Sequence, residues 1–78
     1  MVVHADDLAE EIAQRQADCA RIEQVFPCWL VMWGAASRAY WGYPRFDVPA
    51  GTVASARTPN ELAGRMRAIE RTALGERW

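Results

Sequence analysis

Apolar residues in the first third of the chain recur every three or four positions, the spacing of one helix face. They are Leu8, Ile12, Cys19, Ile22 and Phe26, and Arg15 falls on the same stripe. We predict a helix over residues 7–25, with Asp7 and Glu10 as a capping box at its start. Pro27 ends this helix, because proline lacks the amide donor that a helix needs. The side chains expected on the opposite, solvated side are Glu10, Glu11, Gln14, Asp18 and Glu23.

The segment CWLVMWGAASRAYWGY, residues 28–43, is apolar or aromatic on both alternations. A hairpin with one solvated face would instead alternate apolar with polar residues. The β-branched and aromatic content predicts two strands, at 29–33 and 38–43, joined by a turn at 34–37. Both faces of this hairpin therefore need a cover, one supplied by the chain and one by something else.

Prolines and a glycine mark a loop at residues 44–51, and TVASA at 52–56 predicts a short third strand. A last helix is predicted from the cap residue Thr58 and Pro59 onward, with Glu61 completing a capping box. Its apolar stripe is Leu62, Met66, Ile69 and Ala73, and Gly75 stands where a left-handed residue would end it.

The element order predicts an α+β fold in a single small domain, α-β-β-β-α, that spans residues 1–78. Two helices from the chain ends, joined to three consecutive strands, pack most simply on one face of an antiparallel sheet. We expect a frayed start at residues 1–5 and a tail at 75–78.

The register of the hairpin decides which residues share a face. With a connection at residues 34–37, Trp33 lies opposite Arg38 and Val31 opposite Tyr40. One face then carries Trp29, Val31, Trp33, Arg38 and Tyr40. The other carries Cys28, Leu30, Met32, Ala39, Trp41 and Tyr43. We assign the first face to a partner, because aromatic residues and arginine are enriched at interface hot spots. The second face, with aliphatic and small residues, suits the helices, although a slip of one residue would exchange the two faces.

A chain of 78 residues buries a small core, so such domains often add disulfides, metals or oligomerisation. Cys19 and Cys28 are interpreted as buried small hydrophobes with no disulfide between them, and His4 is the only histidine. No metal or cofactor is expected, which leaves oligomerisation. The start MVVHADDLAEE lacks the features of a signal peptide, and no apolar run is long enough to span a membrane. We therefore expect a cytoplasmic protein.

Catalytic residues do not stand out, and we expect no enzyme. Acids lie mostly on solvated helix faces, and neither Ser37 nor Ser55 has a positioned base. Single-stranded nucleic-acid binding has one argument, because RAYWGYPRF interleaves Arg38 and Arg45 with aromatic residues. The net charge of −1 disfavours it, since phosphate neutralisation supplies most of such affinity. A small-ligand module built around Trp33 and Tyr40 is the other alternative.

Three stretches resemble short actinobacterial proteins of uncharacterised function. They are Phe-Pro-x-Trp-x-Val-x-Trp at 26–33, an arginine and aromatic strand at 38–43, and Ala-x-Thr-Pro-x-Glu-Leu at 56–62. Such proteins resemble companions encoded near transcription regulators or natural-product genes, which implies an accessory or regulatory partner. We predict a non-enzymatic interaction module that forms a homodimer or binds another protein through an aromatic sheet face.

Overall fold

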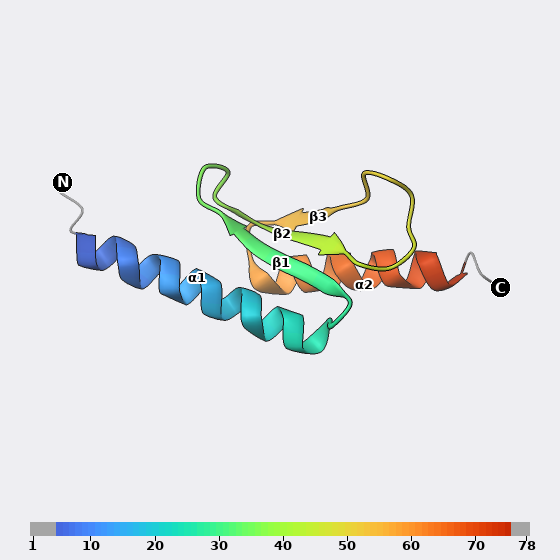
Figure 1. Ribbon diagram of the computed structural model, residues 1–78, viewed down its shortest axis with the longest axis horizontal. Helices are drawn as coiled ribbons and strands as arrows, with labels where there is room; N and C mark the ends of the chain where they lie inside the picture. The colour runs from blue at the N-terminus through green and yellow to red at the C-terminus, as the bar shows by residue number, and fades with distance from the viewer. Residues whose placement is uncertain (1–4, 76–78) are drawn as a thin grey trace.

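The computed structural model describes residues 5–75, and it confirms the predicted α-β-β-β-α order in one small α+β domain (Figure 1). The predicted ends at 1–5 and 75–78 lie outside the described residues, except that Ala5 and Gly75 are helical. The elements are α1 (Ala5–Val25), β1 (Trp29–Gly34), β2 (Ala39–Pro44), β3 (Ala54–Ala56) and α2 (Pro59–Gly75).

The three strands form one antiparallel sheet in the order β1-β2-β3, and both helices cover the same face of it. Figure 1 shows α1 running along β1, with α2 behind the hairpin and β3. The core lies between the helices and this face of the sheet. Its buried residues are Cys19, Ile22 and Phe26 of α1 and its end, Trp29, Val31, Tyr40, Ala54 and Ala56 of the sheet, and Leu62 and Met66 of α2.

The hairpin register differs by two residues from the prediction. Trp33 pairs with Tyr40, and the four-residue connection runs from 35 to 38. Arg38 therefore lies in the turn, where it has a positive φ of 53°, and not on a strand face. Because side chains alternate with a period of two, a shift of two residues leaves the members of each strand face otherwise unchanged.

The predicted capping residues of the two helices are confirmed only in part. At α2 the prediction is confirmed, because the Glu61 amide donates to Thr58 Oγ1 at 3.2 Å. The Glu61 carboxylate accepts from Arg65 at 2.7 Å, an i,i+4 pair, instead of completing the capping box. At α1 the helix begins at Ala5, two residues before the predicted start, so Asp7 lies inside the helix. The predicted end of α2 was also wrong, since the helix includes Gly75.

Helix α1 is longer than the sheet that it covers. Its 21 residues span about 31 Å at 1.5 Å per residue. The six residues of β1 span about 20 Å. The amino-terminal turns of α1 consequently extend past the hairpin, as Figure 1 shows.

Candidate functional site

The two faces of the hairpin have the opposite roles to those predicted. Trp29, Val31 and Tyr40 are buried beneath the helices, and Trp33 packs against the same core. Leu30 and Met32 of the set assigned to the helices are exposed, with half of the Met32 surface accessible. The assignment of the faces was therefore wrong, although the alternation of side chains that separates them was right.

The physical reason for this reversal is that the helices satisfy the polar tips of the buried aromatic residues. Trp29 Nε1 donates to Glu70 Oε2 of α2 at 3.2 Å. The Tyr40 hydroxyl donates to Asp18 Oδ2 at 2.8 Å and accepts from Arg15 Nη1 at 2.9 Å. A buried polar group with such partners avoids the cost of an unmade hydrogen bond. The large side chains of Trp29 and Tyr40 can then be fully buried in the core.

Asp18 is a buried carboxylate in this polar cluster, contrary to its predicted place on the solvated side of α1. Besides Tyr40, it accepts hydrogen bonds from Gln14 at 3.2 Å and from Arg21, with which it forms an ion pair. A buried carboxylate is tolerated when it is paired and hydrogen-bonded in this way. The cluster fixes α1 against the sheet at one position.

A close approach of α2 to the sheet depends on Gly42. A Cβ at this buried position would lie 3.3 Å from both Met66 Sδ and Trp29 Cε3. Gly42 faces the helices together with Val31, its cross-strand partner. This glycine is a sequence signal that could have identified the buried face, because a missing side chain allows the helix to come near.

The predicted small-ligand site around Trp33 and Tyr40 is occupied by the protein itself. The two rings lie 4.9 Å apart, and the Arg15 guanidinium lies 4.4 Å from the centre of the Trp33 ring. This cation–π contact, together with the bond from Arg15 to Tyr40, uses the aromatic surface that a ligand would need. The arginine that interrupts the apolar stripe of α1 thus has a structural role.

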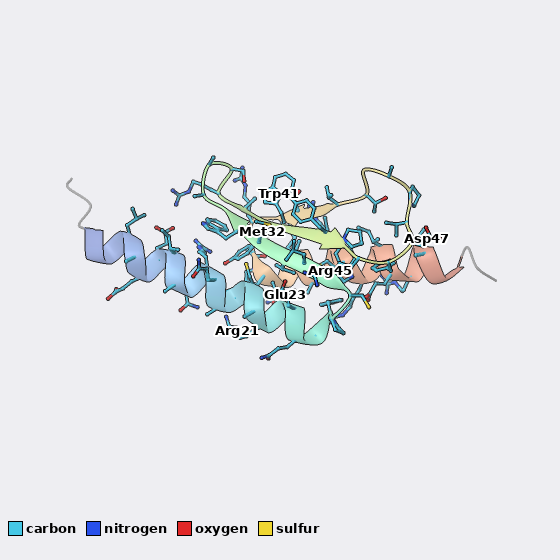
Figure 2. All side chains as sticks on the ribbon, in the orientation of Figure 1. Arg21, Glu23, Met32, Trp41, Arg45 and Asp47 are labelled. Carbon is cyan, nitrogen blue, oxygen red and sulfur yellow. The ribbon has the colours of Figure 1, made fainter. Side chains whose placement is uncertain are left out.

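The sheet face turned away from the helices, here called the outer face, is made of Leu30, Met32, Trp41, Tyr43 and Ser55. Figure 2 shows Trp41 and Met32 on the hairpin, with Glu23 and Arg21 on α1. The pairs Met32–Trp41 and Leu30–Tyr43 lie directly across from one another on the two strands. No charged residue occupies these strand positions. The outer face is therefore mainly apolar, with the neutral polar residue Ser55 on the edge strand β3.

Trp41 is held in place on the outer face by a hydrogen bond to the turn. Its indole Nε1 donates to Ser37 Oγ at 2.9 Å, and Ser37 in turn donates to the Gly34 carbonyl at 3.3 Å. A Cβ on Gly34 would lie 2.9 Å from Trp41 Nε1, so the ring rests over this glycine. A fixed aromatic side chain loses little conformational entropy on binding.

Each edge strand of the sheet has a backbone group that binds a charged side chain from a helix. On β1 the Val31 amide donates to Glu23 Oε2 at 2.9 Å. On β3 the Ser55 carbonyl accepts from Arg65 Nη1 at 2.8 Å. Free backbone groups at a sheet edge recruit further strands, and charged side chains at the edge oppose this. The open surface of the sheet is therefore its outer face.

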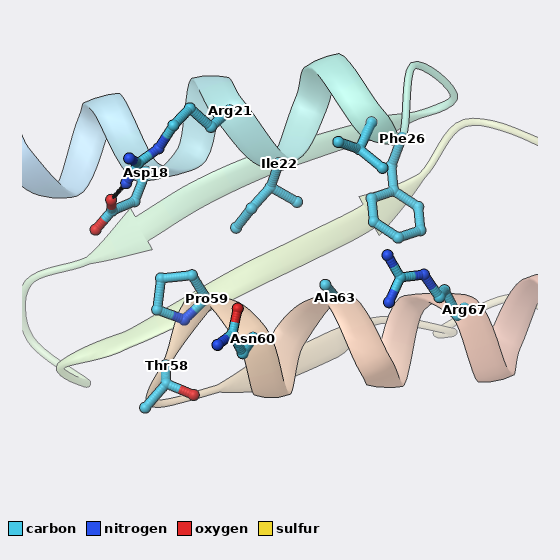
Figure 3. A pocket seen from close by; sticks show the side chains of 10 residues that line it. Asp18, Arg21, Ile22, Phe26, Thr58, Pro59, Asn60, Ala63 and Arg67 are labelled. Atoms are coloured by element: carbon cyan, nitrogen blue, oxygen red, sulfur yellow. Dashed lines mark hydrogen bonds and ion pairs between the residues drawn. The ribbon is translucent and has the colours of Figure 1, made fainter.

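A groove of about 470 Å³ lies between α1 and α2 on the far side of the core (Figure 3). Its charged residues already have partners in the fold, since Arg21 pairs with Asp18 and the Arg67 guanidinium lies 5.5 Å from the centre of the Phe26 ring. Thr58 at its rim caps α2. The polar and charged residues that line this groove therefore have roles in stabilising the fold.

The two cysteines differ in exposure. Cys19 is buried as predicted, but Cys28 is exposed, and both thiols are free. Burial raises the pKa of the Cys19 thiol, with a smaller contribution from the charge of Glu23. Within residues 5–75, no group of three or more His, Cys, Asp or Glu side chains is placed to hold a metal ion.

The fold removes part of the arginine and aromatic surface that the nucleic-acid interpretation requires. Tyr40 is buried, and the Arg38 guanidinium in the turn lies 3.7 Å from the Glu11 carboxylate. Trp41 and Tyr43 remain on the outer face, and the exposed Arg45 follows directly after β2, so only this part of the predicted arrangement is kept.

Comparison of the chain with protein-family models, curated proteins and solved structures finds no match. The resemblance to short actinobacterial proteins therefore stays an expectation from the sequence. Among the described helices, none combines the length and the apolar character needed to cross a membrane.

Proposed function

We propose that this chain is a non-enzymatic interaction module that associates with a second copy of itself, outer face to outer face. The observation that carries the proposal is an uncharged apolar sheet face in a domain whose two edge strands each bind a charged helix side chain. A two-fold dimer places each surface patch against its own copy, so a charge within the patch would meet a like charge. The outer face has none on its strands.

The expected dimer is weak and reversible. A standard interface covers about 800 Å² of each partner and involves about 20–30 residues a side. Five partly exposed side chains on three short strands cover less than this. Two aligned sheets would pack about 10 Å apart, with Met32 and Trp41 near the centre. We place this module in the cytoplasm, since free thiols are typical of that compartment.

The test compares the molar mass of the wild-type protein with that of two variants over a range of concentrations, by sedimentation velocity. Tyr43→Glu puts a charge on the outer face at a residue that is already 38% exposed, so the fold should survive. Val25→Glu makes the same chemical change at an exposed site of α1, and it serves as the control. We expect concentration-dependent dimers for the wild type and for Val25→Glu, and monomers for Tyr43→Glu.

Circular dichroism should show the same secondary structure in all three proteins. A wild-type protein that stays monomeric at millimolar concentration would rule out self-association. Equal dissociation by Tyr43→Glu and Val25→Glu would show that a dimer forms elsewhere. Tight, salt-sensitive binding of a single-stranded oligonucleotide that Tyr43→Glu abolishes would favour the nucleic-acid alternative.

A further inference from the structure

The two methionines within residues 5–75 differ in their access to solvent. Met32 of β1 has half of its surface exposed, whereas Met66 of α2 is completely buried in the core. An oxidant in solution reaches an exposed thioether far more readily than a buried one. Of these two side chains, Met32 is therefore the one that can be oxidised in the folded monomer.

Met32 also lies in the middle of the outer face. It is directly across from Trp41 on β2, and the next pair along the same face is Leu30–Tyr43. Ser55 of β3 is the neighbour of Trp41 on its other side. In a two-fold dimer that covers the outer face, the same side chain comes from both copies, so a change at Met32 occurs twice in one interface.

The chemistry of this position needs only a peroxide as the oxidant. The peroxide O–O bond breaks, one oxygen atom forms a bond to the Met32 sulfur, and the other leaves as water. The sulfur loses the two electrons that the peroxide gains. The product is methionine sulfoxide, a polar side chain that methionine sulfoxide reductases convert back to methionine.

The outer face offers little to compensate a sulfoxide oxygen once it is covered. The indole Nε1 of Trp41, directly across from Met32, already donates to Ser37 Oγ at 2.9 Å. A second copy of the same face brings the same side chains and no charged group on its strands. In the monomer, water binds the new oxygen, whereas in the dimer that hydration is lost. Oxidation therefore favours the monomer.

We propose that Met32 is a reversible oxidation site through which a peroxide dissociates the dimer. This regulation rests on the proposed function, because it requires association through the outer face. The oxidant reacts with the monomer, which a weak dimer releases continually. At high protein concentration the dimer should bury Met32 and slow its oxidation.

The test measures the dimer dissociation constant by sedimentation velocity before and after limited treatment with hydrogen peroxide. Peptide mapping by mass spectrometry should find an added oxygen on Met32 and none on Met66. The dissociation constant should rise about tenfold or more, because each dimer would bury two poorly paired polar groups. Circular dichroism should not change. Methionine sulfoxide reductases with dithiothreitol should restore the dimer, whereas dithiothreitol alone should not, which separates this effect from oxidation of the exposed Cys28 thiol.

Two variants of Met32 provide the controls. Met32→Leu keeps an apolar side chain of similar volume and removes the sulfur. It should form the dimer, and peroxide should not dissociate it, although every other oxidisable side chain is retained. Met32→Gln places a permanent polar group at the same position, so it should be folded and largely monomeric without peroxide.

The outcomes separate this proposal from the dimer itself. A dimer that persists when Met32 carries the added oxygen would overturn the proposal and leave the dimer intact. Equal dissociation of Met32→Leu by peroxide would do the same, since another side chain would then be responsible. A wild-type protein that is monomeric before any treatment would instead contradict the proposed function, and the regulation would fall with it.

Discussion

Tyr40→Phe removes a single oxygen atom from the buried polar cluster and changes no apolar surface. In the native protein this hydroxyl donates to Asp18 at 2.8 Å and accepts from Arg15 at 2.9 Å. Tyr40 is fully buried and Asp18 nearly so, so water cannot replace the lost group without entering the core. We expect the variant to fold and to be clearly less stable.

The expected loss is about 2 kcal/mol of the free energy of unfolding. Hydrogen bonds to charged groups contribute about 1.5–3 kcal/mol each in mutational series. The lower part of this range applies because Asp18 keeps its bonds to Arg21 and Gln14. At about 0.05–0.15 kcal/mol per residue, the whole domain is stabilised by roughly 4–12 kcal/mol. For a domain of this size, the loss corresponds to a decrease in Tm of about 8–16 °C.

The assay is urea unfolding followed by circular dichroism, with Tyr43→Phe as the matched control. Tyr43 lies on the outer face and is 38% exposed, so its variant should stay within about 0.5 kcal/mol of the wild type. A double-mutant cycle with Asp18→Asn should show a coupling energy, because the two side chains are in contact. If Tyr40→Phe were neutral and Tyr43→Phe costly, the buried face would be the one originally predicted, and the reasoning about the polar tips would fail.

Two further predictions concern α2 and the thiols. Thr58→Ala should cost about 0.5–2 kcal/mol in urea unfolding, because it leaves the Glu61 amide without its cap; an unchanged midpoint would place the helix start elsewhere. In the native protein at neutral pH, iodoacetamide should label Cys28 and spare Cys19, which is buried and whose raised pKa lowers its thiolate fraction. Mass spectrometry after digestion identifies the labelled site, and modification of Cys19 at the rate of Cys28 would contradict the packing of α1.

The types and the order of the helices and strands could be predicted from the sequence, because they depend on local features that tertiary packing does not change. Pro27 after a helical stripe, and Thr58-Pro59 before another, mark helix ends through backbone chemistry alone. The division of the hairpin into two sets survived an error of two residues in register, because side-chain direction depends only on odd or even position. Arg38 was misplaced because the turn moved by one residue and took it off the strand.

The burial of one set rather than the other could not be derived from hydrophobicity, since both sets are apolar. What decides it is the match between aromatic polar tips and particular side chains of distant helices, such as Tyr40 with Asp18 and Trp29 with Glu70. Such a match needs the relative placement of the elements, which one sequence does not supply. A helical wheel placed Asp18 among solvated acids, although it is the buried centre of the cluster.

The distribution of charges connects the fold with the proposed dimer surface. Charged side chains bind the edge strands at Glu23 and Arg65 and hold the buried aromatic residues at Asp18 and Glu70, whereas the strand positions of the outer face carry no charge. An apolar dimer should tighten in salts that are excluded from protein surfaces, such as sulfate. A dimer held by this uncharged face should therefore not dissociate as the salt concentration rises, and dissociation by salt would contradict the proposed interface.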